Sequence, residues 1–467
     1  RGGHRCGCIP RCYVAAIRAS QLGKKVAVVE KQQSLGGTCL IWGCIPTKAL
    51  LEHAHAFQMF QHASDWGVAL PYGAPALDMR LVHERKDKIV TSLTKGIDFL
   101  FKKHKIDRIT GTARLVGNSR VDVFEGETQA LEAMDIIVAT GSSPRALPGI
   151  EIDHARIVTS DDAIHLAEVP KSLVVLGAGA VGVEFASIYR RFGSEVTIVE
   201  LLPRLVPGED DAVSAELEKS FKKQGIRSLT GSKVVSVTSD AKGVRVKVKG
   251  PEGKSQSFVV DVLLVATGRS PVTAGLGAEA LGVQMDNGYI RVDAMYRTSV
   301  PNISAIGDVI ALEERAHPQL AHVSSAEGVL VAERLAGQEI HPLNYDHVPS
   351  CTYCDPEIGS VGLTEAEATR RGFDVRVGAF PVGVLGRAKM AGETAGFVKI
   401  VAEKRYDEVL GVHMIGPRST ELVGEAALAL RLECTVEELM KTIHAHPTFS
   451  EAVGEAAHAV HGAAIHV

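Results

Sequence analysis

The segment between residues 172 and 200 constrains the fold of this chain more than any other stretch. It opens with an apolar run at 172–176, typical of a buried parallel strand, and closes with a second such run at 194–200. Gly177, Gly179 and Gly182 stand between the two runs and lead into a helical pattern. A strand, a G-x-G-x-x-G turn and a helix in this order predict a dinucleotide-binding βαβ unit, whose helix N-terminus would hold a pyrophosphate.

An acidic residue closes this unit and indicates which dinucleotide it binds. Glu200 lies 23 residues beyond Gly177, where such units place the side chain that bonds a ribose hydroxyl. A carboxylate at this position would repel a 2′-phosphate. The sequence therefore predicts binding of NAD rather than NADP.

The second half of another unit of this kind lies near the start of the chain. A helical pattern at 13–22 is closed by Gly23, and the apolar strand at 25–30 ends in Glu30. Glu30 is therefore placed to bond a ribose hydroxyl of a second nucleotide.

The turn that should precede this helix departs from the pattern. No apolar strand stands before it, and Gly7 takes the first glycine position while Ile9 and Cys12 take the second and third. The side chain of Ile9 would block the close approach of a pyrophosphate. A metal site from Cys6, Cys8 and Cys12 is an alternative, but the sequence offers no fourth ligand at a matching spacing.

The rest of the chain shows the same alternation of strands and helices. Ala-Thr-Gly turns follow apolar strands at 139–141 and 266–268, which indicates a duplicated architecture. The last third, from about 344, changes character and has strand-like runs followed by helices. Outside the nucleotide units we expect helices at 49–62, 79–104 and 320–335, and strands at 302–306, 396–401 and 409–415.

Composition excludes several classes of protein. The length of 467 residues suggests about three domains, and the net charge of −4 gives no sign of a nucleic-acid partner. No apolar run reaches the roughly 20 residues of a membrane span, and the first residues lack the apolar core of a signal peptide. Eight cysteines are too few for a disulfide scaffold, so we expect a cytoplasmic location.

Two of those cysteines form a motif of their own within 36–48. Cys39 and Cys44 stand five residues apart, which in a regular helix separates their Cα atoms by about 7.5 Å along the axis. A disulfide requires about 4.4–6.8 Å, so the pair can bond only where the backbone leaves helical geometry. Gly43 gives that freedom, and Pro46 would disturb the local hydrogen bonds. A disulfide on such a backbone suits a redox centre better than a structural cross-link.

In combination these motifs resemble those of the flavin-dependent pyridine nucleotide–disulfide oxidoreductases, and within that family the dihydrolipoamide dehydrogenase branch. The resemblance extends from residue 13 to about 457. It is carried by the motifs at 36–48, 139–141, 177–182, 266–268, 305–308, 320–322, 411–417 and 444–451, the last reading His-Ala-His-Pro-Thr-Phe-Ser-Glu.

The resemblance implies an α/β fold with two Rossmann-like dinucleotide-binding domains and an α+β C-terminal dimerisation domain. Its domains would be 1–149 for FAD, 150–269 for NAD, 270–343 as a central domain completing the FAD site, and 344–467 as the interface domain of a homodimer. The implied reaction is oxidation of protein-bound dihydrolipoamide by NAD⁺. The implied partners are lipoyl domains of 2-oxoacid dehydrogenase or related complexes.

The resemblance also implies roles for single residues. Cys39 would exchange with the substrate and Cys44 would lie beside the flavin, while Lys48 and Glu184 would form an ion pair near the flavin. His446, oriented by Glu451, would be the base in the partner subunit's active site. An imidazole suits this task because its pKa is near neutrality and a carboxylate fixes its tautomer.

The expected cofactor residues follow from the same motifs, and no metal site is expected. For FAD they are Glu30, Gly36, Gly37, Thr38, Lys48, Gly111, Thr140, Gly141, Asp308, Leu320, Ala321 and His322. For NAD they are Gly177, Gly179, Gly182, Glu200, Val234, Gly268 and Arg269.

Some positions depart from the family pattern and leave alternatives open. Ile41 replaces the usual Asn, and Cys351 and Cys354 form a C-x-x-C pair that we interpret as incidental. The alternatives are a related NAD(P)H-dependent disulfide reductase, and a flavin-poor homologue that serves as a scaffold. The second is supported only by the irregular first glycine motif.

Overall fold

The structure is a computed structural model that describes residues 5–8, 13–71, 73–125, 127–313 and 315–467. The chain forms two compact units, each built from three stretches of sequence. Unit 1 comprises Arg1–Ala49, Arg80–Arg145 and Arg269–Leu343. Unit 2 comprises Leu50–Met79, Ala146–Gly268 and Asn344–Val467.

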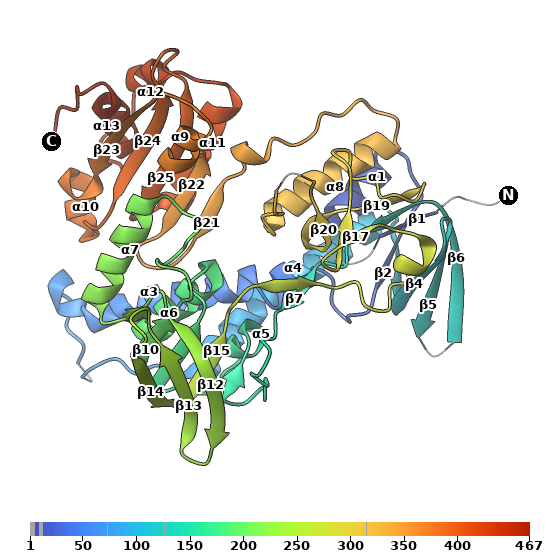
Figure 1. The fold of residues 1–467 in the computed structure, drawn as a ribbon, viewed down its shortest axis with the longest axis horizontal. Coiled ribbons are helices and arrows are strands. Elements are labelled where there is room, and N and C mark those ends of the chain that lie inside the picture. Colours follow the sequence, from blue (N-terminus) through green and yellow to red (C-terminus); the bar gives the residue numbers. More distant parts are fainter. Residues whose placement is uncertain (1–4, 9–12, 72, 126, 314) are drawn as a thin grey trace. The chain divides into compact units, whose positions relative to one another are not determined.

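A largely parallel sheet is the centre of unit 1 (Figure 1). Its five parallel strands, in spatial order, are β3 (Asp107–Thr110), β2 (Val26–Glu30), β1 (Arg5–Cys8), β6 (Glu127–Val138) and β19 (Ile303–Ala305). The first part of β6 also pairs in antiparallel fashion with β5 (Arg120–Glu125), which in turn pairs with β4 (Thr112–Gly117). This arrangement is the Rossmann-like pattern expected from the helix at 13–22 and the strand ending in Glu30.

The sequence shows no apolar strand before the first helix, yet a short strand, β1, occupies that position. Strand β1 lies between β2 and β6, with Gly7 opposite Ala27 on one side and opposite Ile136 on the other. The ladder bonds that hold it come from the backbone, so a run without apolar alternation can still occupy a central strand position. The predictions for Ile9 and Cys12 lie outside the described residues.

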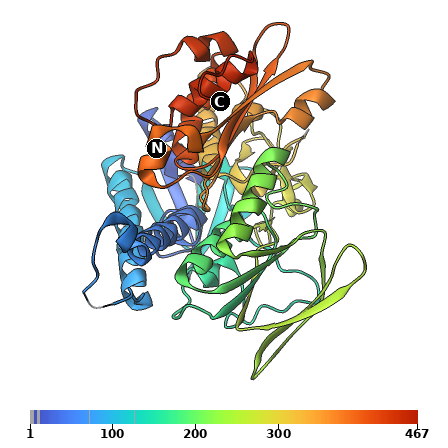
Figure 2. The same cartoon turned by 90° about the vertical axis from the view of Figure 1, so that its left-hand side faces the viewer.

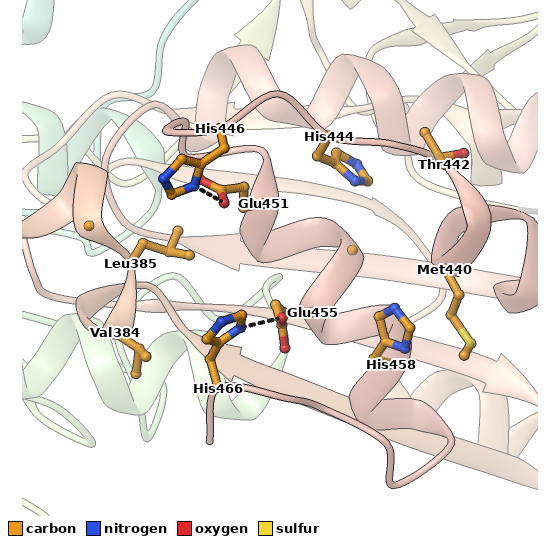
Figure 3. A pocket seen from close by; sticks show the side chains of 12 residues that line it. Val384, Leu385, Met440, Thr442, His444, His446, Glu451, Glu455, His458 and His466 are labelled. Carbon is orange, nitrogen blue, oxygen red and sulfur yellow. Dashed lines mark hydrogen bonds and ion pairs between the residues drawn. The ribbon is translucent and has the colours of Figure 1, made fainter.

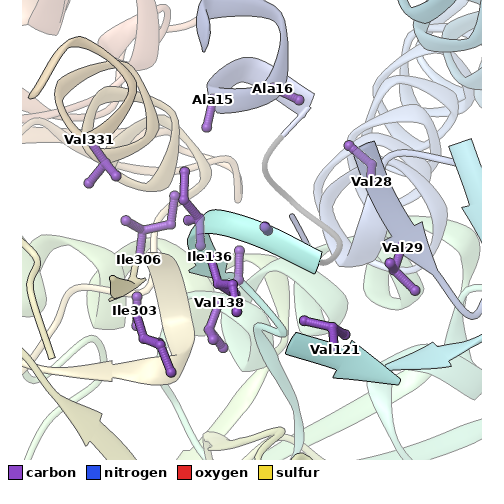
Figure 4. Close-up of a cluster of buried hydrophobic side chains, with 14 of the residues drawn as sticks. Ala15, Ala16, Val28, Val29, Val121, Ile136, Val138, Ile303, Ile306 and Val331 are labelled. Atoms are coloured by element: carbon purple, nitrogen blue, oxygen red, sulfur yellow. The ribbon is translucent and has the colours of Figure 1, made fainter. Parts of the chain in front are cut away.

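Helices cover this sheet and complete its core. They are α1 (Tyr13–Gln21), α2 (Gly37–Ile41), α4 (Met79–Lys103) and α8 (Ala321–Leu335), and α3 (Cys44–Gln61) begins in this unit. Helices α1 and α8 lie close together at Gly328. A Cβ added to this glycine would lie only 3.1 Å from the Cβ of Ala15. Figure 4 shows the apolar cluster beneath them, in which Ile136 and Ile303 are buried.

A second parallel sheet forms the nucleotide-binding part of unit 2. Its strands, in spatial order, are β11 (Arg227–Leu229), β10 (Glu195–Val199), β9 (Ser172–Leu176), β15 (Val262–Val265) and β8 (Ile157–Val158). Its helices are α5 (Ser160–Ala163), α6 (Ala180–Phe192) and α7 (Asp211–Gln224). A separate antiparallel sheet consists of β12 (Lys233–Asp240), β13 (Gly243–Lys249) and β14 (Ser255–Val260), seen as the long yellow-green strands of Figure 2.

The last part of unit 2 is an antiparallel sheet with helices packed on it. Its strands are β21 (Ser350–Thr352), β22 (Ile358–Gly362), β25 (Val409–Ile415), β24 (Phe397–Glu403) and β23 (Val375–Pro381). Its helices are α9 (Glu365–Arg370), α10 (Gly386–Ala391), α11 (Ser419–Arg431), α12 (Val436–Lys441) and α13 (Glu451–Val460). Helix α13 lies against β23 and β24, and α11 lies against β22 and β25.

Unit 1 also contains two small sheets of shorter strands. Strand β7 (Ser142–Pro144) pairs with β16 (Arg269–Pro271), and β18 (Tyr289–Arg291) lies between β17 (Met285–Asp286) and β20 (Ile310–Ala311). In the described part of the chain, no helix is both long and apolar enough to cross a membrane.

A buried ion cluster joins the two parts of unit 2. The ammonium group of Lys399 on β24 lies 2.9 Å from Asp210, which caps α7, and 2.7 Å from Glu365 on α9. The side chains of Lys399 and Asp210 are 8% and 2% exposed. The pairing compensates for the burial of both charges.

The fold is therefore α/β, with two Rossmann-like domains and an α+β C-terminal domain. The predicted helices at 13–22, 79–104 and 320–335 are confirmed to within one or two residues. The exact domain limits at 149, 269 and 343 stay a prediction.

Candidate active site

The two cysteines of the 36–48 motif lie on consecutive helices that are separated by a break. Helix α2 ends at Ile41 and α3 begins at Cys44. The N–H of Trp42 still donates to the carbonyl of Thr38, at 3.0 Å, and the N–H of Thr47 donates to the carbonyl of Gly43, at 3.1 Å. A new helix thus begins directly after Gly43, and the half-buried Cys39 and Cys44 lie near each other. The predicted departure from helical geometry is confirmed.

Gly43 and Pro46 act differently from what their positions in the motif suggest. A Cβ on Gly43 would lie 3.0 Å from the carbonyl oxygen of Thr38, so the glycine permits a close approach of the two helices. The expectation that Pro46 disturbs the ladder is wrong, because this residue lies in the first turn of α3, where an N–H needs no partner within the helix. Gly36 and Gly37 have φ angles of 121° and 58°, which form the sharp entry to α2.

Glu30 ends strand β2 as a buried acid with an unused oxygen. Its Oε1 accepts the N–H of Gln32 at 2.8 Å, while its Oε2 is buried and has no hydrogen-bond partner among the described residues. Burial raises the pKa of its carboxyl to about 7. The carbonyl of Glu30 accepts the N–H of Gly111. Gly111 follows β3 with a φ of 137°, a backbone conformation that favours glycine. An unpaired carboxylate oxygen at the end of β2 fits the ribose hydroxyl of a dinucleotide.

The two Ala-Thr-Gly turns end their strands in the same way. The hydroxyls of Thr140 and Thr267 are both buried, and neither finds a partner in the described part of the chain. Gly141 and Gly268 follow with φ angles of 72° and 110°. Polar atoms of this kind are typical of ligand sites, because burial without a partner costs free energy.

Asp308 is held by a network that sequence reasoning missed in part. It lies in a short 3₁₀ helix, Gly307–Val309, and its Oδ2 accepts the hydroxyl of Ser142 at 2.5 Å. Arg269 donates to the same hydroxyl at 2.6 Å and lies 4.0 Å from Asp308. Arg269 thus contacts groups of the predicted FAD site, whereas its sequence position suggested the NAD site. Ser142 carried no signal except its place after an Ala-Thr-Gly turn.

A buried pair supports the turn that carries Asp308. Glu327 on α8 accepts the N–H of Gly307 at 2.7 Å and lies 2.9 Å from Nε2 of His317. Nδ1 of His317 accepts the N–H of Gln319, so its Nε2 carries the proton. Leu320 and Ala321 begin α8 in this region, and the predicted flavin-site residue His322 is exposed there.

The glycines of the 177–182 fingerprint have separate roles. A Cβ on Gly177 would lie 2.5 Å from the carbonyl oxygen of Ala266, and one on Gly182 would lie 2.0 Å from the carbonyl oxygen of Gly177. A Cβ on Gly179 would meet no described atom within 4 Å. Gly177 and Gly182 therefore allow close packing of strand and helix, and Gly179 leaves an open space at the N-terminus of α6, which fits a pyrophosphate.

Glu200 is positioned at the end of β10 by backbone bonds. Its Oε2 accepts the N–H of Ala178 at 2.6 Å, and its Oε1 accepts the N–H of Leu202 at 2.8 Å. The carboxylate is thereby directed at the glycine turn, which is consistent with the predicted bond to a ribose hydroxyl. Val234 is half-buried at the start of β12.

The two residues of the predicted ion pair belong to different units. Lys48 is half-buried on α3 in unit 1, and Glu184 is 4% exposed on α6 in unit 2. Oε1 of Glu184 accepts the N–H of Tyr353 at 3.0 Å. Next to it, burial raises the pKa of the Cys354 thiol well above its usual range, which keeps this sulfur unreactive. The interpretation of the C-x-x-C pair as incidental stays a prediction.

His446 and Glu451 form a hydrogen-bonded pair in unit 2. Nδ1 of His446 lies 2.8 Å from Oε1 of Glu451, and Oε2 of Glu451 accepts the N–H of Thr448 at 2.8 Å. Burial raises the pKa of Glu451, but these bonds outweigh it, so the pKa lies below its usual value. The ionised carboxylate fixes the proton on Nδ1 and leaves Nε2 to accept another. The imidazole is 77% exposed within the single chain.

The pair lines a cavity of about 370 Å³ (Figure 3). Val384 and Leu385 form an apolar side, and His444 lies near His446 on the same loop. His444 is itself paired with Glu425 on α11, at 2.8 Å. In the described part of the chain, no group of three or more His, Cys, Asp or Glu residues could hold a metal ion.

Comparison with known families matches nearly the whole chain. Residues 10–328 match the pyridine nucleotide-disulphide oxidoreductase family, and residues 348–457 match the dimerisation domain of the same family. Cys39, the glycine turn at 177–182 and the His446–Glu451 pair all lie within these two matches.

Individual relatives agree with this assignment. The chain is 43% identical over 465 residues to dihydrolipoyl dehydrogenase of Bacillus subtilis, covering 97% of this chain and 96% of that protein. It is 42% identical over 463 residues to mitochondrial dihydrolipoyl dehydrogenase of Pisum sativum, covering 98% and 91%.

Solved structures give the same result for the fold. LpdA from Mycobacterium tuberculosis superposes with a TM-score of 0.88 at 27% identity, covering 97% of this chain and 99% of that one. The HOCl-induced flavoprotein disulfide reductase RclA from Escherichia coli superposes with a TM-score of 0.86 at 26% identity, covering 97% and 99%. The chain is an oxidoreductase that uses FAD and NAD and carries a dimerisation domain. It belongs to the pyridine nucleotide–disulphide oxidoreductase family.

Proposed function

We propose that this protein is a dihydrolipoyl dehydrogenase, which oxidises dihydrolipoamide to lipoamide through a Cys39–Cys44 disulfide. The observation that carries the proposal is the redox motif of the family, with its two cysteines near each other across a helix break, in a chain 43% identical to a dihydrolipoyl dehydrogenase. The His446–Glu451 pair supplies the base that a dithiol substrate requires.

The thiol chemistry follows from the properties of sulfur. His446 takes the proton from one substrate thiol, and the thiolate attacks Sγ of Cys39 while Cys44 leaves as a thiolate. The second substrate thiol attacks the substrate sulfur of this mixed disulfide, which closes the lipoyl ring and breaks the bond to Cys39; the proton of the attacking thiol passes to Cys39, which is released as a thiol. Two electrons thus pass from the substrate to the cysteine pair. FAD and NAD, when bound, supply the hydride chemistry that restores the disulfide.

The base and the disulfide would come from different subunits. A dimerisation domain and an imidazole 77% exposed in the single chain support the proposal that His446 serves Cys39 of the partner subunit in a homodimer. The ion pair between Lys48 and Glu184 is part of the same proposal. Its support is that Glu184 is buried and fixed by the N–H of Tyr353.

The cofactor residues named from the sequence are proposed to hold the two dinucleotides. For FAD, the strongest support is the buried Oε2 of Glu30, which lacks a partner among the described residues, together with the held turn at Asp308. For NAD, it is the open space at Gly179 and the backbone-held Glu200. Lipoyl domains of 2-oxoacid dehydrogenase or related complexes are the proposed partners. The cytoplasmic location expected from the sequence stays a prediction.

Purified protein tests the proposal directly. Mixed with dihydrolipoamide and NAD⁺, the wild type should form NADH, and Cys44→Ser should lose this activity while NADH-driven reduction of ferricyanide persists. Cys434→Ser, at a half-buried cysteine on a different part of the chain, is the matched control and should be fully active. A flavin-loaded protein that forms no NADH from dihydrolipoamide but reduces another disulfide would favour the alternative of a related disulfide reductase. A purified protein without bound flavin would favour the scaffold alternative.

A further inference from the structure

Helix α13 carries two carboxylates that each hold a histidine beside the same cavity. Glu451 and Glu455 are four residues apart, so their side chains share one face of the helix. Glu451 is paired with His446, which precedes the helix, and Glu455 is paired with His466, which follows it, with Oε1 2.7 Å from Nδ1. Figure 3 shows both pairs at the cavity, one above the other.

Glu455 fastens the segment 463–467 with two bonds. Its Oε1 is paired with His466, and its Oε2 accepts the N–H of Ile465 at 3.1 Å. The side chain of Glu455 is 12% exposed, and that of His466 is 65% exposed. Burial raises the pKa of Glu455, but the two bonds outweigh it and the pKa lies below its usual value. An ionised, nearly buried carboxylate can therefore hold this otherwise exposed segment in place.

The held segment borders the path to the proposed base. His446 and His466 both line the cavity, with Val384 and Leu385 on its apolar side. Since Nδ1 of His446 is engaged by Glu451, a substrate thiol must approach its other nitrogen. A slender alkyl chain ending in a dithiol can pack against Val384 and Leu385 on the way.

We propose that Glu455 and His466 are positioning residues: Glu455 holds segment 463–467, so that His466 forms part of the wall of this cavity and guides the dithiol arm to His446. The proposal rests on the proposed function, because it takes His446 as the base and a lipoyl-type arm as the substrate. It assigns no chemical step to His466. The expected contribution is to binding and alignment of the arm.

The test uses the full flavin-loaded protein and three changes. His466→Ala removes the imidazole, a chain shortened to residue 462 removes His466 with the rest of the segment, and His466→Gln keeps a donor for Glu455. The matched control is His461→Ala, which breaks a similar pair with Asp407, at 2.9 Å, whose histidine does not line the cavity. For each protein, kcat and KM are measured with free dihydrolipoamide, and flavin content and dimer mass are measured in parallel.

We expect KM for dihydrolipoamide to rise about fivefold or more in His466→Ala and in the shortened chain, with kcat changed less than KM. His466→Gln should recover most of the loss, His461→Ala should match the wild type, and the rate of ferricyanide reduction by NADH should stay constant throughout. Equal KM values in active wild type and His466→Ala would overturn this inference alone. It would also be overturned if the KM change accompanied loss of the dimer, since the segment would then serve assembly. A wild type unable to oxidise dihydrolipoamide would overturn the proposed function and this inference with it.

Discussion

Oε1 of Glu451 lies 2.8 Å from Nδ1 of His446, while its second oxygen accepts the backbone N–H of Thr448 at the same distance. The carboxylate is therefore fixed from two sides and fixes the imidazole in turn. This arrangement gives His446 one defined tautomer, which a base that removes a thiol proton requires.

Loss of the negative charge at Glu451 should slow the thiol step. We expect Glu451→Gln to lower kcat for dihydrolipoamide by about ten- to a hundredfold, because the protonated imidazole loses its counter-charge and its fixed tautomer. Steady-state rates of NADH formation provide the measurement. The control is Glu425→Gln, which breaks the nearby pair with His444 and should leave kcat within about twofold. A larger loss in the control than in Glu451→Gln would contradict the assigned roles.

The His444–Glu425 pair should give the protein a pH-dependent stability. The hydrogen bond that His444 donates to the carboxylate of Glu425 raises the pKa of His444 above its usual value of 6.5, although burial opposes this. A raised pKa means that the stabilisation is fully present below the unfolded-state value and is lost as pH rises through the folded-state value. We expect His444→Gln to lower the free energy of unfolding by about 1 kcal/mol at pH below 6.5, and by less at higher pH. Thermal melts across this pH range measure it, and a loss that does not depend on pH would contradict the pairing.

Two alanine substitutions in the nucleotide fingerprint should separate folding from binding. Gly182→Ala places a Cβ 2.0 Å from the carbonyl oxygen of Gly177, so we expect a large drop in melting temperature. Gly179→Ala meets no described atom within 4 Å, so the chain should fold normally, yet the methyl group enters the proposed pyrophosphate space. We expect Gly179→Ala to weaken NADH binding at least about tenfold with flavin content unchanged. Fluorescence titration with NADH measures this affinity. If Gly179→Ala bound NADH as tightly as the wild type, the pyrophosphate would not lie at Gly179.

Removal of the ammonium group at Lys399 should destabilise unit 2. Lys399→Met leaves the carboxylate of Asp210 buried without its cation, which costs about 3 kcal/mol or more. Chemical denaturation provides the measurement. Lys404→Met is the matched control, because Lys404 pairs with Asp374 in an exposed position and should contribute less than about 1 kcal/mol. If both substitutions lowered the free energy of unfolding equally, burial of the Lys399 cluster would make no extra contribution to stability.

The sequence allowed prediction of those parts whose local pattern and chemistry coincide. Strand β9, the glycine turn and Glu200 form one continuous signal, and the structure places them together. The helix break between Cys39 and Cys44 was predictable from the limits of disulfide geometry. In each case the residues that carry the signal lie within about thirty positions of one another.

Other features depend on residues far apart in the chain and left no local signal. Strand β1 forms because β2 and β6 pair with its backbone on both sides, although its own sequence has no strand pattern. Ser142 bonds Asp308 across 166 positions of sequence. Neither contact could be read from spacing alone, because long-range pairing overrides local propensity.

Two residues at the cavity beside α13 were also not predicted from the sequence, although they lie close to the predicted pair in the chain. The pattern that identified His446 and Glu451 did not indicate Glu455 and His466, although they repeat the same pairing one turn further along. The signal available was the spacing of the two acids, which places them on one helix face. A partner from the exposed segment after the helix is visible only in three dimensions.

The state of the two cysteines after one equivalent of dihydrolipoamide, without NAD⁺ or oxygen, tests the central claim most directly. Alkylation followed by peptide mass mapping should find Cys39 and Cys44 protected in the oxidised protein and both labelled after the addition, with one equivalent of lipoamide formed. The buried Cys354 should remain unlabelled in both samples and serves as the internal control. If Cys39 and Cys44 kept the same labelling before and after the dithiol, the account of this protein as a dithiol oxidoreductase that works through these two residues would be contradicted.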